Sequence, residues 1–144
     1  MERTIRDIIK QQQPVSAPAQ MFVREAARVM KLRRIGAMMV VEHGLLVGIF
    51  TERDALNRVV AESLDARTTT LAEVMTRDPQ TVGPDATFKA ALELMHDGGF
   101  RHVPVVDADK RPLGMISVRD AMGPELESFV YEMLRQEQMN QVLA

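Results

Sequence analysis

The sequence predicts a mixed α/β (α+β) fold in which one structural unit occurs twice, with the two copies related by a pseudo-two-fold axis. Three observations indicate this: two amphipathic helical stripes 65 residues apart, a pair of β-rich runs after each stripe, and a glycine-to-aspartate motif that ends each pair. A unit of about 55 residues has a thin core and an exposed sheet face, so two copies are expected to bury these faces against each other. The duplication therefore predicts one intimate pair.

Each unit is predicted to begin with a short helical turn and a longer helix. The turns fall at residues 4–10 and 70–76, which have apolar residues at equivalent places. In the longer helices the apolar residues recur at i, i+3, i+4 and i+7, which places them on one face. Arg33 and Arg34 are interpreted as a solvated helix end. The apolar residues are Val23, Ala26, Ala27 and Met30 in the first unit, and Phe88, Ala91, Leu92 and Met95 in the second.

A β-hairpin is predicted after each of these helices. The β-rich runs are 37–41 and 45–50 in the first unit, and 102–106 and 112–116 in the second. Turn-forming residues separate the two runs of each pair. The offset between the units changes from 65 to 66 residues across the hairpin turn, where a change in loop length costs little free energy.

The most informative motif lies where each hairpin passes into another predicted helix. It consists of glycine, two apolar residues, a hydroxyl residue, two further residues and aspartate, as Gly48–Asp54 and again as Gly114–Asp120. The hydroxyl residue would cap a helix whose first N–H groups and dipole favour anions, and the aspartate could accept hydrogen bonds from sugar hydroxyls. The same spacing also fits a capping box that serves stability alone. For one copy the two interpretations are balanced, and the second copy favours a binding site.

The predicted domain boundaries follow the repeat. The first repeat covers residues 1–64, a linker covers 65–70, and the second repeat covers 71–122. Gly123 and Pro124 break the chain, and residues 123–144 are predicted to form a C-terminal amphipathic helix that has no counterpart in the first repeat. Its apolar side is predicted to contain Leu126, Phe129, Val130, Met133 and Leu134.

The composition of the 144-residue chain argues against several classes of function. A net charge of −2 with no Trp and one Tyr offers neither a basic field nor stacking platforms for a nucleic acid. No signal peptide and no run of about 18 apolar residues is present, so no membrane partner and a cytoplasmic location are expected. The absence of cysteine and of closely spaced histidines argues against a metal site. No nucleophile, Walker loop or paired catalytic carboxylate is visible, so the chain is expected not to be an enzyme.

The repeated strand–strand–helix order, the run Val-Pro-Val-Val at 103–106 and the motif Gly-Ile-Phe-Thr-Glu-Arg-Asp at 48–54 resemble the CBS domain family, named after cystathionine β-synthase. The resemblance covers nearly all of residues 4–122, and a paired occurrence is more specific than a single motif. It implies a CBS pair of two β-α-β-β-α repeats with two clefts between them. In this family the clefts bind adenosine-containing ligands such as AMP, ADP, ATP, NAD or S-adenosylmethionine.

The resemblance implies a set of nucleotide-binding residues. The hydroxyl residue and the ribose-binding aspartate of the family motif match Thr51 and Asp54, and again Ser117 and Asp120. The residues that border the adenine match Ser16 and Thr81. The base pockets match Ile35, Gly36, Ala37 and Met38 in the first repeat, and Phe100, Arg101, His102 and Val103 in the second.

Basic residues near these positions are expected to differ between the two sites. Arg101 and His102 resemble the phosphate partners of the family, and Arg53 and Arg119 could assist them. The first repeat supplies no charge at the positions equivalent to Arg101 and His102. It also has the segment 17–21 in place of the Pro-Asp-Ala-Thr of the second repeat, which removes a helix cap. We therefore expect two unequal sites.

Three functional hypotheses follow. The preferred one is a non-catalytic, energy-sensing regulatory module that needs no cofactor, binds an adenine nucleotide or related adenosyl ligand as its effector, and signals to an unknown effector protein. The second is a ligand-free dimerisation or adaptor module, which the predicted C-terminal helix motivates. The third is a small nucleotide hydrolase, for which no catalytic group is visible. A homodimer is expected under the first two.

Overall fold

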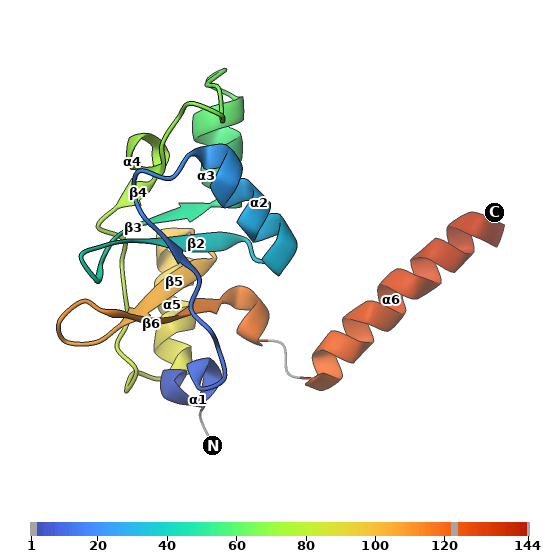
Figure 1. Ribbon diagram of the computed structural model, residues 1–144. Coiled ribbons are helices and arrows are strands. Elements are labelled where there is room, and N and C mark those ends of the chain that lie inside the picture. The colour runs from blue at the N-terminus through green and yellow to red at the C-terminus, as the bar shows by residue number, and fades with distance from the viewer. Residues whose placement is uncertain (1–2, 122–123, 144) are drawn as a thin grey trace.

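The computed structural model describes residues 3–121 and 124–143 and confirms the predicted mixed α/β fold with a C-terminal helix (Figure 1). The first repeat contains α1 (Ile5–Ile9), β1 (Ser16–Ala17), α2 (Val23–Arg33), β2 (Ala37–Glu42), β3 (Leu45–Thr51), α3 (Glu52–Asp54) and the π-helical η1 (Ala55–Val60). The second repeat contains α4 (Leu71–Val74), β4 (Thr76–Arg77), α5 (Phe88–Gly98), β5 (His102–Val106), β6 (Pro112–Ser117) and the 3-10 turn η2 (Val118–Ala121). The last helix is α6 (Pro124–Leu143).

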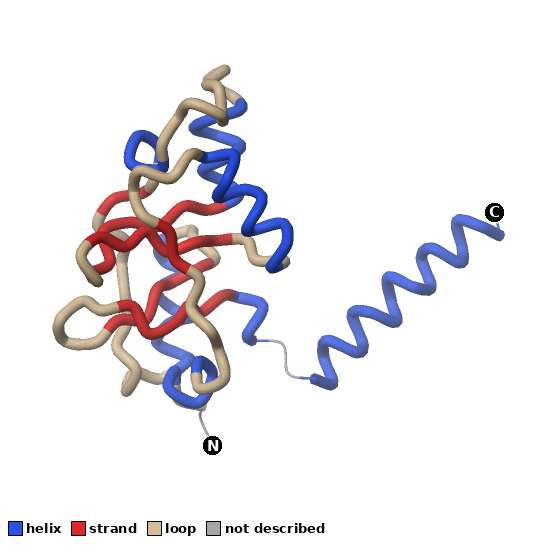
Figure 2. Tube along the Cα trace, viewed as in Figure 1, coloured by secondary structure: helices blue, strands red, loops and turns tan. Residues whose placement is uncertain are grey.

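Two sheets form the centre of the molecule (Figure 2). In the first sheet β1 runs parallel to β2, β2 pairs with β3 antiparallel, and β3 pairs with β4 antiparallel. In the second sheet β5 and β6 pair antiparallel. Ala37 lies opposite Thr51 in the first hairpin, and His102 lies opposite Ser117 in the second, so the two hairpins share one register. Each strand-to-helix corner therefore sits beside the start of its neighbouring strand.

The short helices α1 and α4 each pack into the core of the other repeat. Ile5 of α1 is fully buried in the core that contains α5, and Leu71 of α4 is fully buried in the core that contains α2. Backbone hydrogen bonds attach both: Ile5 N–H donates to Ala86 O at 3.1 Å, and Leu71 N–H donates to Met21 O at 2.9 Å. The segments that begin each repeat are thus exchanged between the two cores.

The glycine of the repeated motif makes room for this exchange. A Cβ atom on Gly48 would lie 3.0 Å from the carbonyl oxygen of Thr76, which follows α4. A Cβ atom on Gly114 would lie 2.8 Å from Ile9 Cγ2 and 2.9 Å from Gln12 Oε1, which follow or end α1. Both approaches are too close for a side chain, so glycine is required here because a neighbouring segment packs directly against the strand.

A small apolar cluster joins the two sheets. Met39 and Leu46 from the first hairpin pack with Val106, and Met115 packs against the same cluster. Leu46 N–H donates to Lys110 O at 3.0 Å, which links the two hairpin ends. The repeats therefore bury part of their strand surface against each other, which agrees with the intimate pair predicted from the duplication.

One local prediction was wrong, and one predicted helix is shorter than its counterpart in the other repeat. Ala27, predicted on the buried face of α2, is exposed, although Val23, Ala26 and Met30 are buried as expected. The second helix of the second repeat is only the single turn η2, in contrast to the nine residues of α3 and η1 in the first repeat.

The predicted C-terminal helix is present as α6, and it extends away from the two sheets in Figure 1. Met133 and Leu134, predicted on its apolar side, are exposed. The side chains of Leu126, Phe129 and Val130 lie outside the described residues.

Candidate functional site

Two cavities lie between the repeats, and both are built in the same crossed manner. Cavity 1 combines residues 34–37, which connect α2 to β2, with residues 117–120, where β6 turns into η2. Cavity 2 combines residues 99–102, which connect α5 to β5, with residues 51–54, where β3 turns into α3. We call residues 34–37 and 99–102, each of which leads from a helix into a strand, the strand entrances. Each cavity therefore combines the strand entrance of one repeat with the hydroxyl-to-aspartate corner of the other.

The two cavities differ in size. Cavity 1 has a volume of about 870 Å³ and cavity 2 of about 360 Å³. Both values lie within the range of roughly 300–1,000 Å³ that is usual for small-molecule sites. Cavity 1 has an apolar part that could hold a flat ring, formed by Met30, Ile35, Met39, Phe50, Ala55 and Met115.

The corner of cavity 2 is firmly bonded to its surroundings. Asp54 Oδ2 accepts from Thr51 N–H at 3.0 Å, and Thr51 Oγ1 accepts from Asp54 N–H at 3.1 Å, which forms a complete capping box. Asp54 Oδ1 accepts from the Thr76 hydroxyl at 3.4 Å and lies 3.6 Å from Arg58 Nε. Asp54 is only 8% exposed. Both oxygens of this carboxylate therefore already have protein partners.

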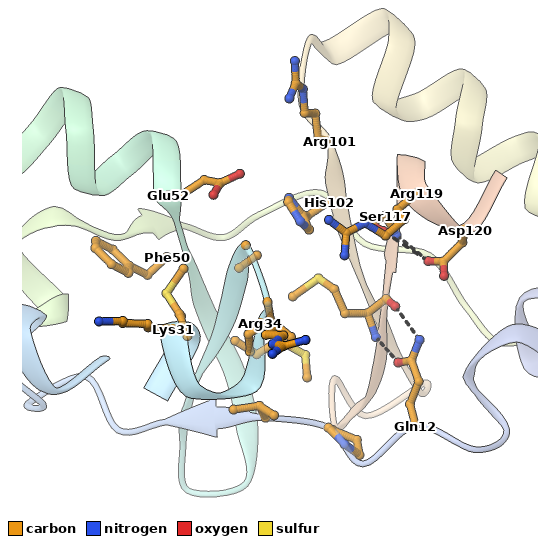
Figure 3. Close-up of a pocket in the computed structure, with 18 of the residues that line it drawn as sticks. Gln12, Lys31, Arg34, Phe50, Glu52, Arg101, His102, Ser117, Arg119 and Asp120 are labelled. Carbon is orange, nitrogen blue, oxygen red and sulfur yellow. Dashed lines mark hydrogen bonds between the residues drawn. The ribbon is translucent and has the colours of Figure 1, made fainter. Parts of the chain in front are cut away.

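The corner of cavity 1 is less constrained. Asp120 Oδ2 accepts from Ser117 N–H at 2.8 Å and from the Ser117 hydroxyl at 3.4 Å. Within the described part of the chain, the Asp120 side chain has no ion-pair partner, and its carboxylate is half-buried at the cavity wall (Figure 3). Arg3 donates to the backbone oxygen of Asp120 at 2.7 Å, which fixes the turn. Asp120 Oδ1 therefore has no bonded partner among the described residues, and Asp120 lines cavity 1.

The structure shows local capping bonds at both corners of the repeated motif, and the binding interpretation stays a prediction. The aspartates bond to their own helix ends, as a capping box predicts, and both corners also line cavities.

The N-terminal cap of α5 shows the asymmetry predicted between the repeats. Thr87 accepts from Ala90 N–H at 3.1 Å, but Phe22 at the start of α2 makes no side-chain cap.

A scan of known protein families gives the same assignment. The CBS domain model matches residues 5–61 and again residues 71–123. The chain belongs to the CBS domain family. The CBS pair is 34% identical to the CBS domain-containing protein CBSX3, mitochondrial, of Arabidopsis thaliana over 105 residues, covering 69% of this chain and 50% of that protein. It spans only 15% of the length of a second Arabidopsis thaliana relative, CBSCBSPB5, with 42% identity over 82 residues.

Solved structures share the fold of this CBS pair over most of its length. The CBS domain protein PAE2072 from Pyrobaculum aerophilum, complexed with AMP, superposes with a TM-score of 0.77 at 25% identity, covering 90% of this chain and 99% of that one. The CBS domain pair of protein MJ0100, in complex with 5-methylthioadenosine and S-adenosyl-L-methionine, has a TM-score of 0.73 at 29% identity, covering 84% and 94%.

Most residues implied by the CBS resemblance line a cavity, and four do not. Ser16 and Thr81 are exposed and lie outside both cavities, and Met38 and Val103 are buried in the two cores. The residues on cavity 1 are Ile35, Gly36, Ala37, Arg101, His102, Ser117, Arg119 and Asp120. Those on cavity 2 are Thr51, Arg53, Asp54, Phe100, Arg101 and His102.

Several cavity residues of the CBS pair were not predicted from the sequence. Glu52 lines both cavities, and Arg34, interpreted as a solvated helix end, lines cavity 1. Gln12 also lines cavity 1, where its amide accepts from Met115 N–H at 3.0 Å and donates to Met115 O at 2.9 Å. The sequence contained one signal that singles out Arg34. The 65-residue offset aligns Arg34 with Gly99, so the first repeat has an arginine at the position where the helix of the second repeat ends with glycine.

His102 lies in the wall shared by both cavities of the CBS pair. Burial lowers the pKa of the His102 imidazole below its usual 6.5, the nearby Glu52 carboxylate partly opposes this, and Arg101 and Arg119 lower it further. The Asp120 carboxylate raises the pKa slightly. The imidazole is therefore held neutral near pH 7.

The lowered pKa of His102 predicts a loss of stability in mild acid. Below about pH 6.5 the unfolded chain binds a proton that the folded protein resists, so the free energy of unfolding falls as the pH drops toward the folded-state pKa. Urea denaturation between pH 8 and pH 5 measures this. The His102→Gln variant should have a flatter pH profile, and His96→Gln, on the exposed side of α5, should match the wild type. An unchanged slope in His102→Gln would contradict the prediction.

Within the described ranges, no helix combines the length and the apolarity needed to cross a lipid bilayer.

Proposed function

We propose that this CBS pair is a non-catalytic regulatory module that binds an adenosine-containing ligand in the cavities between its repeats and signals to a partner chain. The observation that carries the proposal is the pair of corresponding cavities, each of which joins the strand entrance of one repeat to the hydroxyl-and-aspartate corner of the other. Carboxylates of this kind suit the adjacent hydroxyls of a ribose. The complexes of PAE2072 with AMP and of MJ0100 with adenosyl ligands support the same ligand class.

The crossed construction of the cavities supplies a way to signal. A ligand in cavity 1 would contact residues 34–37 of one repeat and residues 117–120 of the other. Binding therefore favours whichever relative arrangement of the repeats makes both sets of contacts, and the difference in affinity between arrangements becomes the signal. No catalytic group is needed for this role.

Isothermal titration tests ligand binding. AMP, ATP, NAD and S-adenosylmethionine are titrated separately into the protein, and at least one is expected to bind with a dissociation constant below 1 mM, roughly the weak end for small regulatory ligands. The variant Asp120→Asn should weaken binding, because the amide accepts fewer hydrogen bonds from ribose. Asp97→Asn, on the exposed end of α5, is the matched control. Absence of binding by all four ligands would refute the proposal.

We further propose that the CBS pair forms a homodimer through the outer side of its helices. Leu32 on α2 is 82% exposed, and Leu56 and Val60 on η1 are 59% and 68% exposed. Large apolar side chains exposed on neighbouring helices are typical of protein–protein contacts. Analytical ultracentrifugation should detect a dimer at micromolar concentration that Leu56→Glu weakens and the surface control Lys89→Glu does not. A monomeric wild-type protein would contradict the proposal.

This exposed surface also favours the second candidate function, a ligand-free adaptor. In that case the homodimer forms, but none of the four ligands raises the melting temperature. The two measurements together therefore separate a sensor from an adaptor.

A further inference from the structure

Cavity 1 has two arginine side chains that face the same space from opposite repeats. Arg34 follows α2 of the first repeat and Arg119 lies in η2 of the second, and both line cavity 1. In Figure 3 the Arg119 side chain lies beside His102, and Arg34 lies on the side of the first repeat. Among the side chains that the structure describes, neither guanidinium has a carboxylate within 4.0 Å or donates to a protein acceptor. Two like charges in one cavity repel each other, and an anion between them would remove this repulsion.

The equivalent positions of cavity 2 lack this arrangement. The repeat offset aligns Arg34 with Gly99 and Arg119 with Arg53. Arg53 Nη1 donates to the carbonyl oxygen of Gly99 at 3.2 Å. The guanidinium group equivalent to that of Arg119 is therefore bonded to the backbone of Gly99, the residue that stands in place of Arg34. Arg53 and Arg101 line cavity 2, but no arginine there stands at the position equivalent to Arg34.

The backbone of Arg34 supports a role for its side chain. Arg34 ends α2 in the left-handed region with φ of 56°, and Gly99 ends α5 in the same conformation with φ of 71°. Glycine adopts this conformation without a steric penalty, but a residue with a Cβ atom does not. The first repeat thus keeps arginine at a position where glycine would suit the helix end better.

The remaining charges of cavity 1 are mixed. Lys31 and Arg101 also line it, and Glu52 and Asp120 supply two carboxylates. In Figure 3 Lys31 and Arg101 extend away from the space between Arg34 and Arg119. Asp120 is placed for the ribose, as proposed above, and the anionic end of the same ligand would then reach the two arginines.

We propose that cavity 1 selects adenosine ligands that have two or three phosphates over neutral or cationic adenosyl ligands, with Arg34 and Arg119 binding the phosphates across the boundary between the repeats. This inference rests on the proposed function, because it assumes that an adenosine ligand occupies the cavity. Guanidinium groups bind phosphate oxygens with paired, charge-assisted hydrogen bonds. A sulfonium cation such as that of S-adenosylmethionine would instead meet two positive charges.

The difference in size between the cavities agrees with this selectivity. Cavity 1 is more than twice as large as cavity 2, at about 870 Å³ against 360 Å³. It therefore has room for a phosphate chain beyond the nucleoside. Because the phosphates would contact both repeats, the number of phosphates would determine how strongly the ligand fixes their relative arrangement.

Titration calorimetry without divalent cations tests the selectivity. Adenosine, AMP, ADP, ATP and S-adenosylmethionine are titrated into the wild-type protein, and the affinity is expected to rise with the number of phosphates and to be at least about tenfold higher for ATP than for adenosine, since bonds to charged groups contribute this much. Equal affinities for ATP and S-adenosylmethionine would overturn this inference and leave the proposed function intact. If none of the five binds, and NAD does not bind either, the proposed function fails as well.

Three variants locate the phosphate contacts. Arg34→Gly and Arg119→Gln are each expected to weaken ATP binding about tenfold and to leave adenosine binding unchanged. Arg34→Gly should have a melting temperature no lower than that of the wild type, because glycine suits the left-handed helix end, so its lost affinity would not reflect misfolding. Arg33→Gln removes the same charge from the adjacent residue, which does not line either cavity, and should bind ATP normally. Equal effects of all three variants, or none, would overturn the assignment.

Discussion

Replacing Ile5 with alanine is expected to destabilise the protein by about 2–5 kcal/mol, the usual cost of truncating a buried isoleucine, and to loosen the second repeat first. Ile5 belongs to the first repeat in sequence, but its side chain is fully buried in the core formed by α5, β5 and β6. The cavity left by the truncation would lie in that core. The strands β5 and β6 should therefore lose protection before β2 and β3 do.

Hydrogen-exchange mass spectrometry measures this difference peptide by peptide. The reciprocal variant Leu71→Ala should expose β2 and β3 first, because Leu71 is buried in the core that contains α2. Urea denaturation gives the total loss of stability for each variant. If Ile5→Ala loosened β2 and β3 while β5 and β6 stayed protected, the exchanged packing of α1 and α4 would be wrong.

Removing the two motif aspartates is expected to have unequal consequences. Asp54→Ala should lower the free energy of unfolding by about 1–3 kcal/mol, because it leaves partly buried donors without their charged acceptor. Those donors are Thr51 N–H, the Thr76 hydroxyl and, at 3.6 Å, the Arg58 guanidinium. Within residues 3–121 and 124–143, Asp120→Ala removes side-chain bonds to Ser117 alone, in a half-buried corner, and should cost about 1 kcal/mol, as the loss of a typical helix cap does.

Chemical denaturation followed by circular dichroism distinguishes the two variants, and Asp54→Asn separates charge from hydrogen bonding. The asparagine can still accept from Thr51 N–H but no longer pairs with Arg58, so its stability should fall between those of the wild type and Asp54→Ala. Ligand binding is expected to respond in the opposite order, since Asp120 Oδ1 has no bonded partner among the described residues, whereas both oxygens of Asp54 have one. Equal losses of stability in Asp54→Ala and Asp120→Ala would contradict this account.

The repeat could be predicted because each of its signals is local. A helix stripe such as Val23, Ala26 and Met30 depends only on spacing, and a hairpin depends on two β-rich runs around a turn. The first corner depends on two residues three positions apart, Thr51 and Asp54, whose mutual hydrogen bonds need only the local turn of the backbone. Ala27 was wrongly placed in the core because the stripe fixes the centre of the buried face and does not fix its width.

The cavities could be predicted only in part for the same reason. The corners and the strand entrances were identified singly, but the structure pairs residues 34–37 with 117–120 and residues 99–102 with 51–54. Arg34 was missed because its importance depends on facing Arg119 across the boundary between the repeats. Ser16 and Thr81 were assigned by resemblance, and both lie outside the described cavities.

The sequence by itself determined the duplication, the order of helices and strands, and the hydroxyl-and-aspartate corner in each half, because neighbouring residues specify all of these. Only the tertiary structure decided that α1 packs with the second core and α4 with the first, and that each cavity combines one repeat's corner with the other's strand entrance. The physical reason is that burial of apolar surface is non-directional: Ile5 and Leu71 each need an apolar surface, but nothing in their spacing says which one. In the structure α1 lies against Gly114 and the segment after α4 lies against Gly48, and both close approaches are possible because glycine has no Cβ atom.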